Sequence, residues 1–167
     1  MHPLSTVSPA AVKYYDQAVN EYLSLSSSPS SSLSAALVED PDFLMGHITT
    51  GLLFLLSTGV TVSDPTVAQC LKETRRLMRK GCGTKRERAF AGAFYALACG
   101  RNRACVSILE AILQVHPTDV LALRAAHDLH FFNGDQVQLM ASPARVYREF
   151  DPSMPGYGYV CGMFAFG

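Results

Sequence analysis

Hydrophobic residues recur every three or four positions through most of this chain, which is the spacing that places them along one side of an α-helix. The clearest stretch is 86–117, which reads as two short amphipathic helices closed by a proline. Small and medium residues stand where the two helices must pack, namely Gly92, Ala93 and Ala96 opposite Cys105, Leu109 and Ile112. Their size predicts a close helix crossing.

The same periodicity, with prolines and glycines as boundaries, predicts the other elements. Helices are expected at 9–23, 33–38, 43–57, 65–80 and 120–133, then from 135, and finally from 155 to 167. Serines dominate 24–34, which predicts a loop, and Pro143 is expected to interrupt the helix that starts at 135. No segment alternates polar and apolar residues as a strand does. We therefore expect an all-α fold of about eight or nine helices.

Two amphipathic helices closed by a proline are the plan of a tetratricopeptide repeat (TPR). One such unit cannot bury its apolar face alone, so units stack into a solenoid. We expect residues 1–167 to form a single segment of this kind, as antiparallel helix pairs. Within it, 86–117 is the clearest repeat and 118–152 a degenerate one.

Several short phrases extend this pattern along the whole chain. They are Pro3-Leu4-Ser5-Thr6, Tyr15-Asp16, Asp40-Pro41-Asp42-Phe43, Met45-Gly46-His47, Thr50-Gly51-Leu52, Arg86-Glu87, Ile112-Leu113-Gln114, His116-Pro117-Thr118-Asp119, Leu121-Ala122-Leu123, His127-Asp128 and Phe132. Together they resemble the N-terminal part of the tetratricopeptide repeat protein 38 family. The resemblance implies a TPR-like array, an intracellular protein without established catalytic activity, and a chain that ends before the family does. The chain departs from the family at 24–34 and at Pro143.

Basic residues are concentrated although the formal net charge is zero. A basic stripe holds Lys72, Arg75, Arg76, Arg79, Lys80, Lys85, Arg86 and Arg88. Those in the helix expected at 65–80 share one face, which could meet phosphates or an acidic peptide. Aromatic residues for base stacking are missing between them. We therefore expect a solvated outer face and no nucleic acid partner.

Three histidines are the sharpest candidates for chemistry. His127 and His130 are three positions apart and share a helix face, where they could bind a metal with Asp128 nearby; His47 completes the set. The alternative is that these histidines are packed and hydrogen-bonded in the interior, and we expect that.

The sequence 81–85 lacks the contiguous Gly-Lys-Ser/Thr of a phosphate loop, so a turn with an exposed Cys82 is expected. No cofactor is expected.

The compartment follows from the cysteines and the N-terminus. Five cysteines, an odd number without a C-x-x-C pair, indicate reduced thiols, and no secretory signal is visible at the N-terminus. The apolar stretch 43–60 is barely long enough to span a membrane and carries polar residues, so a buried helix explains it better. We expect a cytoplasmic protein without a membrane segment.

These observations predict a non-catalytic segment that binds a peptide or helix of another protein. The alternative is a metal-dependent or hydrolase-like enzyme that uses His47, His127 and Asp128. At the C-terminal end, Val160, Met163, Phe164 and Phe166 form a strongly apolar helix. We expect this helix to be uncovered and to promote self-association.

Overall fold

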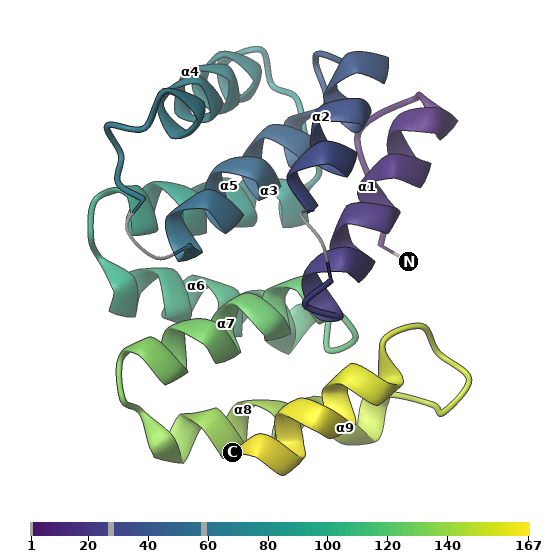
Figure 1. The fold of residues 1–167 in the computed structure, drawn as a ribbon, viewed down its shortest axis with the longest axis vertical. Coiled ribbons are helices and arrows are strands. Elements are labelled where there is room, and N and C mark those ends of the chain that lie inside the picture. The colour runs from purple at the N-terminus through teal and green to yellow at the C-terminus, as the bar shows by residue number, and fades with distance from the viewer. Residues whose placement is uncertain (1, 27–28, 58–59) are drawn as a thin grey trace.

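The computed structural model of the protein describes residues 2–26, 29–57 and 60–167 (Figure 1). In these residues the fold is all-α, with nine α-helices and one short 3-10 helix. The elements are α1 (Pro9–Leu23), α2 (Pro29–Glu39), α3 (Leu44–Leu56), α4 (Pro65–Arg79), α5 (Lys85–Ala98), α6 (Asn102–Val115), α7 (Val120–Phe132), α8 (Gln136–Val146), η1 (Tyr147–Glu149) and α9 (Tyr157–Phe166). The predicted all-α, solenoid-like fold is confirmed.

Helices that follow one another in the chain pack together, as α1 with α2, α3 with α4 and α5 with α6. Figure 1 shows the later helices α6 to α9 continuing the stack below the first ones. The contact between α3 and α5 joins the second and third pairs. Phe43, Phe90 and Phe94 are fully buried in the resulting core. Gly51 of α3 lies against the ring of Phe94, where a Cβ atom would come within 2.1 Å of the ring.

The α5 and α6 helices are the pair that the sequence marks most clearly. Thr84 caps α5 in a capping box with Glu87, which satisfies free backbone N–H groups at the helix start. Ala93 and Ala96 are buried in α5, and Gly92 faces Ile108 of α6. The buried residues of α6 include the expected Cys105, Leu109 and Ile112. The small residues of α5 thus lie at a helix contact, as predicted.

Three local predictions are wrong, and the first concerns the serine-rich segment. The stretch 24–34 is not a loop throughout, because α2 begins at Pro29 and buries Leu33 and Ala36; Ser27 and Ser28 lie outside the described residues. The apolar side chains of this segment pack on α1, which outweighs the low helix propensity of its serines.

Pro143 does not interrupt its helix, because α8 runs through it. Proline cannot donate a hydrogen bond to the carbonyl four residues earlier, that of Leu139. Instead, α8 buries Leu139, Ser142 and Val146 and packs against α7 and α9. This packing offsets the lost hydrogen bond, and the helix continues.

The C-terminal helix α9 is only partly uncovered. Val160 and Met163 are buried, and α9 packs on α8, so the prediction that all four apolar side chains lie open is wrong for these two. Phe164 and Phe166 remain 41% and 64% exposed. Phe166 also makes ring contacts with His127 and Phe131 of α7.

Among the described residues, no helix has both the length and the apolar character needed to cross a membrane. The apolar stretch expected at 43–57 forms α3, which is 13 residues long and largely buried between its neighbours. Thr58 and Gly59, which close the apolar stretch 43–60, lie outside the described residues.

Candidate functional site

A cavity of about 180 Å³ lies between α1, the start of α7 and the segment 150–156. The N-terminal residues His2 and Leu4 form part of its lining. Its apolar wall consists mainly of Val19, Leu23, Val120, Leu121, Phe150 and Met154. Figure 1 shows the end of α1 reaching the level of α7, above the segment that leads into α9. We call this space the Arg86 cavity, after the buried cation in its lining.

Arg86 and Asp119 form a buried ion pair in the lining of the Arg86 cavity. The Nε atom of Arg86 donates to Oδ2 of Asp119 at 2.6 Å, and the side chains are 7% and 1% exposed. The other carboxylate oxygen of Asp119 accepts from the Ala122 N–H at 3.1 Å, so Asp119 is the N-cap of α7. The sequence predicts this role for Thr118 or Asp119. The pair therefore fixes the start of α5 to the start of α7.

The outer nitrogens of Arg86, Nη1 and Nη2, make no hydrogen bond within the described residues. The guanidinium packs over the ring of Phe90, 4.9 Å from its centroid, and Nε is used by Asp119. The Nη1 atom is buried and has no hydrogen-bond partner among the residues that the structure describes. Burial opposes the positive charge, but the hydrogen bond and the charge of Asp119 outweigh it and raise the pKa of Arg86. A charged donor without an acceptor in a cavity wall is costly unless a ligand or solvent supplies one.

The N-terminal segment is held against this site by Glu87, the neighbour of Arg86. Oε1 of Glu87 accepts from both the N–H and the hydroxyl of Ser5 at 3.0 Å, while Oε2 accepts from the Thr84 N–H. Thr6 donates to the carboxylate of Asp40 at the end of α2. His2 reaches His116, with 5.1 Å between the ring centroids. These contacts make residues 2–8 a fixed wall.

Two further titratable groups line the Arg86 cavity. Burial raises the pKa of Asp16, and its carboxylate has no hydrogen bond or ion pair within the described ranges. Burial also lowers the pKa of His2, although Asp119 acts in the opposite direction. His2 is therefore mainly neutral near pH 7. Arg86, Asp119 and Asp16 together give the lining a small negative formal charge.

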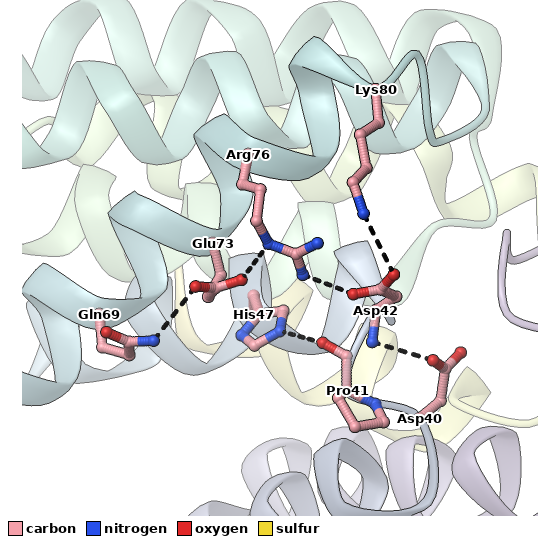
Figure 2. Close-up of polar contacts among 8 residues, drawn as sticks. All are labelled: Asp40, Pro41, Asp42, His47, Gln69, Glu73, Arg76 and Lys80. Atoms are coloured by element: carbon pink, nitrogen blue, oxygen red, sulfur yellow. Dashed lines mark hydrogen bonds and ion pairs between the residues drawn. The ribbon is translucent and has the colours of Figure 1, made fainter.

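His47 lies elsewhere, in the first turn of α3, and its side chain reaches the turn that precedes this helix (Figure 2). Its Nε2 atom is 2.9 Å from the carbonyl oxygen of Pro41. Figure 2 shows Arg76 of α4 between Glu73 and Asp42, with both ion pairs at 2.5 Å. Lys80 approaches Asp42 at 3.8 Å. This network fastens α4 to the turn before α3.

His127, Asp128 and His130 do not form one group with His47. Burial lowers the pKa of His127, whose ring contacts Leu139 and Phe166. Asp128 accepts from the Tyr22 hydroxyl and pairs with Arg124 at 2.9 Å. His130 lies 3.2 Å from Glu110 on α6. Across residues 2–26, 29–57 and 60–167, no three His, Cys, Asp or Glu side chains gather closely enough to bind a metal ion.

The basic stripe does not form one continuous surface. Arg86 is buried, Arg76 and Lys80 are paired with Asp42, and Arg88 donates to the carbonyls of Gly81 and Gly83. Lys72, Arg75, Arg79 and Lys85 are exposed. The glycines of the 81–85 turn have positive φ, 79° at Gly81 and 92° at Gly83, as expected for a turn between helices.

Sequence reasoning missed the Arg86 cavity. It assigned Arg86 to the basic stripe and Asp119 to a helix cap, and it did not pair them. A signal was present, because the phrases containing Leu4, Tyr15-Asp16, Arg86-Glu87 and His116–Asp119 meet in space around this cavity. No known protein-family model matches the chain, and no solved structure matches it. The family resemblance therefore stays a prediction.

Proposed function

We propose that this chain is a non-catalytic, TPR-like helical-repeat segment of the tetratricopeptide repeat protein 38 family, and that it binds a peptide segment of another protein. Consecutive packed helices with small residues at the α5–α6 contact support the TPR-like part of the proposal. Helical-repeat proteins commonly act through extended binding surfaces.

The observation that carries the binding function is the Arg86 cavity. It combines apolar walls with a few buried polar groups, which is the usual make-up of a ligand site. Arg86 uses only Nε in a hydrogen bond among the described residues, so its outer guanidinium nitrogens remain for a partner. Its rim includes Met154, which is 40% exposed, so a partner can reach the opening.

The absence of catalysis is part of the proposal. Each residue of the alternative enzyme set has a structural contact: His47 with Pro41, His127 with Leu139, and Asp128 with Tyr22. These contacts give the three side chains packing roles. A cytoplasmic location is also proposed. It is supported by the five free thiols, of which Cys70 and Cys105 are buried in the helical core.

Selection from a displayed peptide library tests the binding function. Val19→Trp fills the cavity from α1, and Val38→Trp places the same side chain on the exposed face of α2 as a matched control. We expect peptides that bind the parent chain and Val38→Trp but not Val19→Trp. If every enriched peptide binds all three proteins equally, the cavity is not the binding site.

A further inference from the structure

The Arg86 cavity also indicates what kind of group it binds. This inference rests on the proposed peptide-binding function and goes one step further, to the chemistry of the bound residue. Three features decide it: the size of the cavity, the charge of its lining, and the hydrogen-bonding atoms of Arg86 and Asp16 that no described residue uses.

The size fits one medium apolar side chain. A cavity of about 180 Å³ is slightly larger than the engineered cavities of roughly 150 Å³ that hold benzene. Branched and unbranched aliphatic residues and one aromatic ring make up its apolar wall, including Val19, Leu121 and Phe150. A leucine-sized side chain fills such a space without the strain that a larger one would cause.

The charge disfavours an anionic ligand. The positive charge of Arg86 is already balanced by Asp119 at 2.6 Å. Asp16 adds a second carboxylate to the lining, and His2 is mainly neutral near pH 7 because burial lowers its pKa. The N-terminal amine acts on Asp16 and Arg86 is paired with Asp119, so a ligand carboxylate would bring a charge that no free cation of the lining balances, whereas a neutral acceptor brings none.

The unpartnered polar groups call for an acceptor and a donor. The outer guanidinium nitrogens of Arg86 can donate to a carbonyl oxygen, and the Asp16 carboxylate can accept from an N–H group. A main-chain amide carries both in one neutral group. We infer that the Arg86 cavity binds a neutral amide next to a leucine-sized aliphatic group, with the amide carbonyl on Arg86.

This chemistry has two sources, an internal leucine of a peptide and a small free amide. Calorimetry with the full chain compares N-acetyl-leucinamide with N-acetyl-leucine, which is anionic, and N-acetylglycinamide, which lacks the side chain. A nonapeptide with one central leucine serves as the peptide probe. We expect saturable binding of N-acetyl-leucinamide, on the order of tenfold or more tighter than either small control, because each control lacks one of the two features.

Variants connect the binding to the cavity. Val19→Trp should abolish it and Val38→Trp should leave it unchanged, with thermal melting used to verify that both fold. Arg86→Lys keeps the charge beside Asp119 but loses the planar fork, and it should weaken amide binding at least severalfold.

The outcomes separate the two proposals. Cavity-dependent binding of the peptide and of N-acetyl-leucinamide supports both. Binding of N-acetyl-leucinamide without the peptide supports the amide site and overturns the peptide-binding function. Equal binding of N-acetyl-leucine, unchanged binding by Val19→Trp, or no binding of N-acetyl-leucinamide overturns the inference. In the last case, cavity-dependent peptides from the library would leave the proposed function standing.

Discussion

The guanidinium of Arg86 and the carboxylate of Asp119 are joined at 2.6 Å although the residues are 33 positions apart. Each belongs to the start of a helix, α5 for Arg86 and α7 for Asp119. The same pair lies in the wall of the cavity. The ion pair therefore joins two helix starts and also lines the cavity that we propose as the binding site.

Removing one partner of this pair should be costly. Arg86→Met leaves the Asp119 carboxylate buried without its cation, so we expect the free energy of unfolding to fall by about 3–5 kcal/mol in urea denaturation. Adding Asp119→Asn to Arg86→Met removes the orphaned charge and keeps an oxygen for the α7 cap, so the double variant should be more stable than Arg86→Met. A loss below about 1 kcal/mol for Arg86→Met would contradict the buried pairing.

Gly51 should not tolerate a methyl group. The Cβ atom of Gly51→Ala would lie 2.1 Å from the Phe94 ring, so overpacking should lower the free energy of unfolding by about 1–3 kcal/mol. Gly162→Ala is the matched control, because nothing lies within 4 Å of that position on the exposed face of α9. There the gain in helix propensity should stabilise the protein by about 0.5–1 kcal/mol. If both changes alter the free energy of unfolding equally, the close packing of α3 on α5 at Gly51 is contradicted.

Glu110 should make stability depend on pH in the acid range. Burial opposes its negative charge, but hydrogen bonds from His130 and Arg145 outweigh it and lower the pKa of Glu110 from 4.5 to about 2. Its carboxylate thus contributes about 3 kcal/mol, which is fully present above pH 4.5 and lost as the pH falls towards 2.

Comparison with Glu110→Gln isolates this group from the other carboxylates. The difference in the free energy of unfolding between parent and variant should narrow as the pH is lowered from about 5 to about 3. A difference that stays constant over this range would mean that Glu110 titrates normally.

The aromatic cluster at the C-terminal end should promote self-association. The ring of Phe131 contacts the rings of Phe132 and Phe166, with centroid distances of 5.8 and 6.0 Å respectively. They are 55%, 59% and 64% exposed. Burial of such side chains is favourable by roughly 1.5–3 kcal/mol each, so we expect sedimentation to detect dimers or larger species at tens of micromolar. Phe131→Ser with Phe166→Ser should shift the population towards monomer, whereas Val7→Ser with Val38→Ser should not. A parent chain that sediments as a monomer would show that the cluster does not drive association.

Local signals in the sequence predicted most helices, because helical periodicity depends on neighbouring residues. The helices expected at 9–23, 65–80 and 120–133 are α1, α4 and α7, with bounds that differ by at most one residue. Pro143 was misread because α8 is held by its packing against α7 and α9, which the local sequence does not reveal. The Arg86 cavity was missed for the same reason: its residues come from five separate stretches, and only packing brings them together.

The central claim is that Arg86 uses Nε for the fold and keeps its outer guanidinium nitrogens for a ligand. Nuclear magnetic resonance of arginine-labelled protein measures these atoms directly, and Arg86→Lys assigns the resonances by their loss. On saturation with N-acetyl-leucinamide, the Nη resonances of Arg86 should shift while the Nε resonance, held by Asp119, should stay in place. Guanidinium resonances that all remain unchanged, or an Nε resonance that moves with them, would contradict this division of roles.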